Sequence, residues 1–159
     1  VAGMEAPDFS ADVGEAVDFR LSALRGRTVI LYFYPKDDTP GCTREALEFQ
    51  RHASAFRSLG AVVVGVSRDD LDSHREFAAD LQLTFTLVPD PDGRIHDLFG
   101  AWKQDSLWGR IAFGVERSTF LIGPDGIVRK VWRGVVPSRH AAEVLDYLRE
   151  SAAEVKARW

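Results

Sequence analysis

Two spacings of hydrophobic residues alternate along this chain of 159 residues. Residues 28–34 and 61–67 are nearly continuous apolar runs, a pattern typical of strands that are buried on both faces. Between them, four apolar residues recur at the spacing of one helical face: Ala46, Phe49, Ala53 and Phe56. A helix that joins two buried strands predicts a right-handed βαβ unit with parallel strands.

Shorter patterns predict hairpins near both ends of the chain. Alternation around Gly14 predicts an N-terminal β-hairpin over residues 9–20. Its inward-facing residues are expected to be Phe9, Val13, Val17 and Phe19. Towards the other end, the turn sequence at 123–126 separates two apolar runs that should pair antiparallel.

The whole pattern predicts an α/β protein without internal repeats or linkers. In chain order the expected elements are the hairpin 9–20, strand 28–34, helix 39–58, strand 61–67, helix 71–81, strand 85–88, a turn at 90–93, helix 94–99, strands 118–122 and 127–132, and a last helix that Ser138 caps and that runs towards Trp159. The apolar face of that last helix is expected to consist of Ala142, Leu145 and Leu148. Residues 100–114 show no regular pattern.

Composition and charge narrow the possible functions. Apolar residues make up 45% of the chain and charged residues 28%, which predicts one soluble globular domain over residues 1–159. A formal charge of −4 argues against nucleic acid or an anionic membrane as partner, because such contacts need clustered Lys and Arg. We find neither a signal-peptide pattern nor an apolar run long enough to span a bilayer, so a cytoplasmic location is expected. Residues 1–3 precede Met4, which is consistent with residues added before a native start.

The only cysteine, Cys42, stands where a buried strand gives way to a helix. Pro35 ends the strand because it has no N–H for the ladder, Thr39 is a good N-cap, and Pro40 suits the first helical position. Cys42 should therefore lie in the first helical turn, where unpaired N–H groups and the helix dipole favour a thiolate.

A free cysteine is more often a small buried hydrophobe than a nucleophile. Its neighbours here are small or polar, so we expect an accessible sulfur: Gly41, Thr43, Arg44 and Glu45. One cysteine allows no internal disulfide. The four histidines lack metal-ligand spacing, and the acidic pair after Pro35 is expected to form a turn, so neither a metal nor a cofactor is expected: His52, His74, His96, His140, Asp37 and Asp38.

Pro35, Thr39 and Cys42 match the Pro-x-x-x-Thr-x-x-Cys motif of the peroxiredoxins, and the string YFYPKDDTPGCTREA resembles their bacterioferritin comigratory protein (PrxQ) branch. About 75 residues on, GVERSTFLI resembles the stretch that carries the active-site arginine of that family, which here is Arg117. The resemblance implies a thioredoxin-like fold, with a central mixed sheet flanked by helices, and the predicted order of elements agrees with it.

The resemblance also implies a function. Cys42 would attack hydrogen peroxide or an organic hydroperoxide and become a sulfenic acid, with Thr39 and Arg117 binding the peroxide and Pro35 shielding the thiolate. Gly41 and Glu45 would support the site. Glu45 would either complement the helix dipole or orient an arginine.

The sequence departs from many PrxQ relatives at Leu47, where they carry a resolving cysteine. A one-cysteine mechanism follows, with an external reductant that would be thioredoxin, glutaredoxin or a small thiol. By resemblance the protein is expected to be a monomer. Alternatives are a redox relay or sensor that passes oxidation from Cys42 to a partner protein, and a non-enzymatic binding or holdase module. Retention of Thr39, Cys42 and Arg117 together disfavours the holdase.

Overall fold

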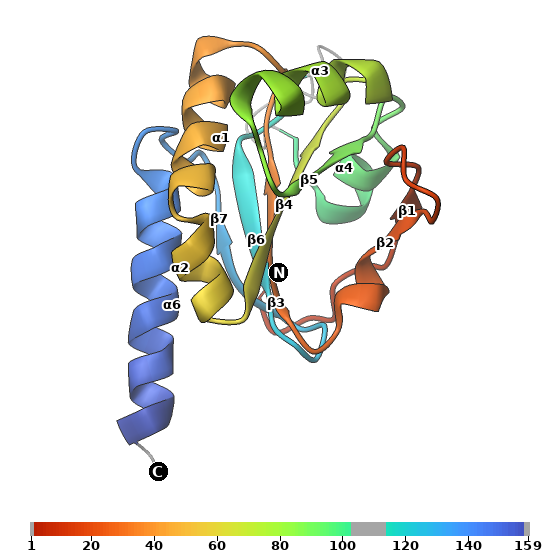
Figure 1. The fold of residues 1–159 in the computed structure, drawn as a ribbon. Helices are drawn as coiled ribbons and strands as arrows, with labels where there is room; N and C mark the ends of the chain where they lie inside the picture. The colour runs from red at the N-terminus through yellow and green to blue at the C-terminus, as the bar shows by residue number, and fades with distance from the viewer. Residues whose placement is uncertain (1, 103–113, 158–159) are drawn as a thin grey trace.

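The computed structural model describes residues 2–102 and 114–157, and it is built around a five-stranded mixed sheet (Figure 1). The strands lie in the order β5-β4-β3-β6-β7. Their bounds are Thr28–Phe33 (β3), Ala61–Ser67 (β4), Thr86–Pro89 (β5), Ser118–Ile122 (β6) and Val128–Trp132 (β7). β3 pairs parallel with β4 and antiparallel with β6, so the predicted βαβ unit and the second hairpin share one sheet.

The central strand β3 is buried on both faces, as its apolar run predicts. Leu31 and Phe33 contribute to one hydrophobic core, whereas Ile30 and Tyr32 contribute to the core on the opposite face. This alternation follows from the two-residue repeat of a strand. The sheet is therefore the middle layer of three.

Helices cover one face of this sheet and a mixed layer covers the other (Figure 1). The face that contains Ile30 packs against α1 (Pro40–Arg51), α2 (Ala53–Ser58), α3 (Leu71–Leu81) and α6 (His140–Ala157). The face that contains Leu31 packs against α4 (Arg94–Phe99), the 3₁₀ helix η1 (Leu21–Leu24), and the N-terminal hairpin of β1 (Ser10–Ala11) and β2 (Phe19–Arg20). The predicted thioredoxin-like arrangement is confirmed.

Three local predictions are wrong. Val17 is 79% exposed, because the paired part of the hairpin is only two residues long on each side and ends at Phe19. The helix expected over 39–58 breaks at His52 into α1 and α2. The last helix begins at His140 rather than directly after Ser138, and it buries Ala141 and Val144 instead of Ala142.

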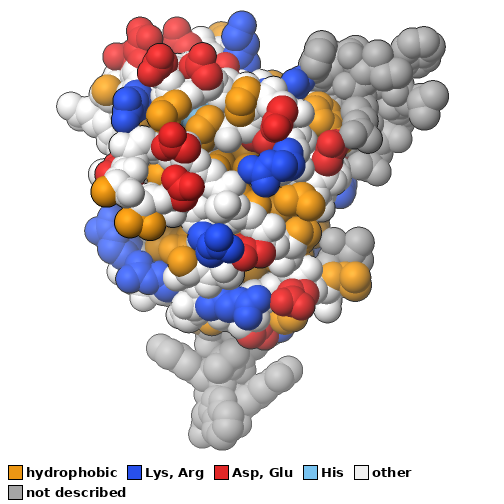
Figure 2. Space-filling view, turned by 90° about the vertical axis from the view of Figure 1, so that its right-hand side faces the viewer, with side chains coloured by type: hydrophobic (Ala, Val, Ile, Leu, Met, Phe, Trp, Pro, Cys, Tyr) orange, Lys and Arg blue, Asp and Glu red, His pale blue; other side chains and the backbone are white. Residues whose placement is uncertain are grey.

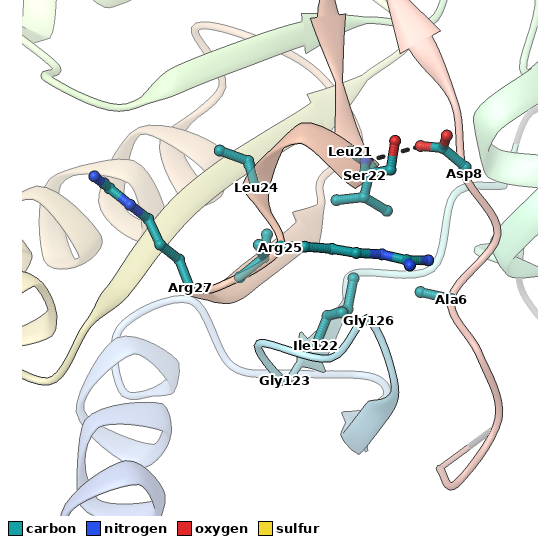
Figure 3. Close-up of a pocket in the computed structure, with 11 residues that line it drawn as sticks. Ala6, Asp8, Leu21, Ser22, Leu24, Arg25, Arg27, Ile122, Gly123 and Gly126 are labelled. Carbon is teal, nitrogen blue, oxygen red and sulfur yellow. Dashed lines mark hydrogen bonds between the residues drawn. The ribbon is translucent and has the colours of Figure 1, made fainter.

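The N-terminal end of β3 lies beside a small hollow (Figure 3). Its volume of about 20 Å³ holds about one water molecule. Asp8 closes part of it by accepting a 2.9 Å hydrogen bond from the Ser22 N–H. This hollow lies at the opposite end of β3 from Cys42, and it is too small for an organic substrate.

Within residues 2–102 and 114–157, no helix combines the length and apolar character needed to cross a bilayer. The same residues contain no group of three His, Cys, Asp or Glu side chains placed to hold a metal ion. Most of the segment predicted to be irregular, residues 103–113, lies outside the described residues, as does the expected helix end at 158–159.

Candidate active site

Cys42 lies in the first turn of α1, as the sequence predicts. Thr39 occupies the N-cap position with an extended backbone (φ −94°, ψ 153°), and Pro40 is the first helical residue. The first helical hydrogen bond joins the Thr43 N–H to the Thr39 carbonyl at 2.8 Å. The amides of Gly41 and Cys42 thus belong to the helix start, where N–H groups have no intrahelical acceptor and can stabilise an anion.

The expectation of an accessible sulfur is wrong, because Cys42 is only 1% exposed. It belongs to the hydrophobic core that contains Tyr32 and Ala46. Of its polar neighbours in sequence, Arg44 is exposed and Thr43 is half-buried, whereas Glu45 is buried as Cys42 is. A water-sized molecule can reach such a sulfur through small side-chain movements, but a large reagent requires the helix start to open.

Arg117, 75 residues away in sequence, lies against Cys42. One terminal nitrogen, Nη2, donates to the Cys42 Sγ at 3.3 Å, and the other, Nη1, donates to Glu45 Oε1 at 2.7 Å. The Arg117 side chain is only 16% exposed, so both interactions are well shielded from solvent. The planar fork of the guanidinium therefore spans the sulfur and the carboxylate at fixed geometry.

Glu45 forms an ion pair with this arginine, and its orienting role stays a prediction. Its side chain is fully buried, and its second oxygen, Oε2, has no hydrogen-bond partner among the residues that the structure describes. Burial raises the pKa of Glu45 to about 7, although the charge of Arg117 opposes the rise. Burial also works against the charged form of Arg117, but Glu45 and Cys42 outweigh it and raise the pKa of the guanidinium above its ordinary value.

Thr39 holds the N-cap position without capping the helix through its side chain. Its hydroxyl instead donates to the Lys36 carbonyl at 2.8 Å, within the loop before the helix. This bond uses the hydroxyl hydrogen and leaves oxygen lone pairs to accept a bond from a ligand. Pro35 lies two residues after the end of β3 and is exposed, and its shielding of the sulfur stays a prediction.

Gly41 lies where two other segments approach the helix start. A Cβ added to Gly41 would stand 3.2 Å from Arg117 Nη2 and 3.6 Å from Pro137 Cγ. The Arg117 carbonyl in turn accepts a 3.1 Å hydrogen bond from the Val135 N–H. The segment between β7 and α6 therefore borders the site, and the small size of Gly41 makes room for the guanidinium.

Sequence reasoning missed a buried polar cluster beside the site. Asp37, expected to be a simple turn residue, is buried and accepts hydrogen bonds from Tyr34 at 2.6 Å and Ser73 at 2.8 Å. Its carboxylate also lies 2.7 Å from His74 Nδ1. The signal in the sequence was an acidic residue inside the motif, but its partner His74 lies 37 residues away.

Two other histidines are also buried and hydrogen-bonded. His96 Nδ1 lies 2.6 Å from Asp90, and His140 Nε2 lies 2.7 Å from the Thr119 hydroxyl. Burial lowers the pKa of His140 despite the neighbouring Glu143. Both also pack against core rings, His96 against Phe33 and His140 against Phe49.

Comparisons with known proteins agree with this geometry. The AhpC/TSA family profile matches residues 2–131. The chain is 41% identical over 150 residues to the peroxiredoxin Bcp of Bacillus subtilis, covering 93% of this chain and 94% of that protein.

The fold is also similar to that of solved peroxiredoxin structures. A structure of the Xanthomonas campestris bacterioferritin comigratory protein, determined in work on its alkyl peroxide reduction activity, superposes with a TM-score of 0.82 at 36% identity, covering 96% of this chain and 99% of that one. A cysteine-to-serine mutant of X. campestris peroxiredoxin Q superposes with a TM-score of 0.84 at 38% identity, covering 94% and 98%.

Fold, motif and relatives thus agree. The chain belongs to the AhpC/TSA family and, within it, to the Bcp/PrxQ peroxiredoxins, which are thiol-dependent peroxidases.

Proposed function

We propose that Cys42 is the nucleophile that reduces hydroperoxides and that Arg117 and Thr39 hold the substrate during the attack. The observation that carries this proposal is the Arg117 fork, which reaches the sulfur at 3.3 Å and a buried carboxylate at 2.7 Å. The thiolate attacks the terminal peroxide oxygen, so an S–O bond forms while the O–O bond breaks. Cys42 becomes a sulfenic acid, and the leaving alkoxide or hydroxide takes up one proton.

Arg117 is the main source of thiolate stabilisation in this mechanism. Opposite charges 3.3 Å apart attract by about 5 kcal/mol at an effective dielectric constant of 20, before the cost of desolvation is subtracted. A helix N-terminus supplies about 0.3 to 2 kcal/mol. The arginine therefore stabilises the thiolate more than the helix N-terminus does. Its N–H donors can also stabilise the negative charge that develops on the leaving oxygen.

Thr39 is proposed to accept a hydrogen bond from the O–H group of the hydroperoxide. Since its own hydrogen is directed at the Lys36 carbonyl, the hydroxyl oxygen can accept a hydrogen bond from the substrate O–H. This interaction would align the O–O bond with the sulfur, as in-line displacement requires.

Recycling needs an external thiol, because Cys42 is the only cysteine in the sequence and Leu47 replaces the resolving residue of many relatives. A first thiol would condense with the sulfenic acid to a mixed disulfide and release water. A second thiol would then release Cys42 and leave with the first as a disulfide. Thioredoxin, glutaredoxin and small thiols are the candidate reductants.

We further propose a monomer that works in a reducing compartment such as the cytoplasm, on hydrogen peroxide and organic hydroperoxides. The alkyl peroxide reduction named for the X. campestris relative supports the organic substrates. Figure 2 shows acidic and basic side chains interspersed with hydrophobic ones on the face that carries β1, β2 and α4, which argues against a nucleic-acid site on that face.

Substitution of Cys42 by serine tests the proposal. Cys42→Ser should abolish peroxide consumption and keep the fold, whereas wild type given one equivalent of peroxide without thiol should gain one oxygen and react with a sulfenic-acid reagent. Peroxide turnover by the serine variant near the wild-type rate would refute it. If wild type is oxidised but no added thiol restores turnover, the relay alternative is supported.

A further inference from the structure

Asp37 and His74 form a buried pair that joins the active-site loop to α3. The loop of residues 34–39 connects β3 to α1 and therefore carries both Thr39 and the helix start. Asp37 and His74 have side chains that are only 3% and 2% exposed, and they meet at 2.7 Å. A polar contact so well shielded from water is stronger than the same contact at the surface.

The contacts of both ring nitrogens of His74 fit a ring that carries two protons. Its Nδ1 faces the Asp37 carboxylate, and its Nε2 lies 3.1 Å from the Val88 carbonyl oxygen in β5, which can only accept. Burial works against ionisation of Asp37, but bonds from His74, Tyr34 and Ser73 outweigh it and hold the pKa of Asp37 below its ordinary value.

The remaining neighbours of the ring leave this assignment unchanged. The Tyr34 hydroxyl stands 3.4 Å from Nδ1, but it is 2.6 Å from Asp37 Oδ1, to which it gives its single hydrogen. On α3 itself, Arg75 is directed away and donates to the Gly14 carbonyl. Each ring nitrogen of His74 therefore faces an acceptor, a carboxylate on one side and a carbonyl on the other.

The loop is held on both sides of this pair. The Asp37 N–H donates to Asp69 at 2.8 Å, and the Lys36 carbonyl accepts from Thr39. Between these anchors, Asp38 has a left-handed backbone with φ of 61°. Such a conformation is uncommon outside glycine and persists where surrounding contacts enforce it.

We propose that the charged His74 is a positioning residue for peroxide reduction: through its ion pair with Asp37 it holds the active-site loop so that Thr39 and the Cys42 amide meet the substrate in line. This inference rests on the proposed function. It assigns no contact between His74 and the substrate. It adds a residue of α3 to a site otherwise built from the helix start and Arg117.

The protein offers a matched control in His96. His96 is buried beside Asp90 at 2.6 Å, in the same Nδ1-to-carboxylate arrangement. Its Nε2 has no partner among the described residues, so a single ring proton satisfies it. The Asp90 carboxylate accepts from the N–H groups of Ile95 and His96 at the start of α4, which places this pair outside the active-site loop.

The test has a spectroscopic and a kinetic arm. Ring ¹⁵N chemical shifts of reduced wild type at pH 7 should show two protonated nitrogens for His74 and one for His96. His74→Gln should slow oxidation of Cys42 by hydrogen peroxide about 10- to 100-fold, since small misplacement of reacting groups has effects of this size. The rate at which iodoacetamide alkylates Cys42 in this variant should change far less, because alkylation does not require an aligned peroxide.

Further variants separate positioning from general stability. Asp37→Asn should resemble His74→Gln, and the double variant should be no slower than either single one, because the two residues act as a unit. His96→Gln should lose stability and keep its peroxide rate. A single protonated nitrogen on His74, or a His74→Gln rate equal to wild type, would overturn the inference. Failure of wild type itself to react with peroxide would instead overturn the proposed function.

Discussion

Glu45→Gln is the most quantitative test of the site, because the burial of one carboxyl group should appear in the pH dependence of stability. The side chain is fully buried, bonded to Arg117 at 2.7 Å through one oxygen and unpartnered at the other. Its pKa is raised from 4.5 to about 7. The folded protein thus binds this proton more tightly than the unfolded chain, so the stabilisation is fully present below pH 4.5 and is lost as pH rises through 7.

The magnitude follows from the size of the rise. A shift from 4.5 to about 7 corresponds to about 3 kcal/mol of unfolding free energy lost across that pH range. Glutamine keeps the shape and the acceptor for Arg117 but does not titrate. The stability of wild type minus that of Glu45→Gln should therefore fall by about 3 kcal/mol between pH 4.5 and 7.5.

Urea denaturation of both proteins across this range, with Cys42 kept reduced, measures the difference. Subtraction of the two curves cancels the titration of other groups, including His140, whose pKa is lowered by burial. The low pKa values of Asp37 and Asp90 place their transitions below this window. Parallel curves for wild type and variant would show that Glu45 is ionised throughout, and the reasoning about its burial would be wrong.

Three further substitutions probe the helix start. Arg117→Lys should slow oxidation of Cys42 by peroxide more than alkylation by iodoacetamide, because lysine keeps the charge but loses the planar fork; an equal decline would limit the arginine to stabilising the thiolate. Gly41→Ala should slow oxidation of Cys42 by peroxide several-fold without lowering the melting temperature, because the added Cβ would stand 3.2 Å from Arg117 Nη2. An unchanged rate would show that the guanidinium can move without effect on the reaction. Leu47→Cys, at a site 42% exposed, should convert both thiols to a disulfide after peroxide treatment only if α1 unwinds. The reason is that Cα atoms five residues apart in a helix lie roughly 8 to 9 Å from each other, whereas a disulfide tolerates about 7 Å. Accumulated sulfenic acid would show that the helix does not open.

The sequence predicted the strands and helix starts that are determined by a few neighbouring residues. The apolar run at 28–34 predicted a strand buried on both faces, and β3 is such a strand. Pro40 predicted the start of α1, because a residue without an N–H is tolerated in the first helical turn. The break at His52 had no such signal, because the apolar spacing continues through it to Phe56.

The site is formed by residues that are far apart in the sequence, and no local pattern predicts such contacts. Arg117 was found only through its resemblance to a family motif, since nothing in its own segment points to Cys42. The burial of Cys42 was missed because its sequence neighbours are small or polar, while in the fold it shares a hydrophobic core with sheet residues such as Tyr32. His74 looked like one of four scattered histidines until the fold placed it against Asp37.

The burial of Cys42 has a kinetic consequence for turnover. Hydrogen peroxide is close to water in size and can react with a cysteine that is only 1% exposed, whereas a protein thiol must present its own sulfur along the S–O axis. The two half-reactions therefore make opposite demands on α1, which must be closed for oxidation and open for reduction. Under saturating reductant, turnover should level off at the rate of helix opening, whatever thiol is supplied, and the sulfenic form would then be the resting species in an oxidising burst.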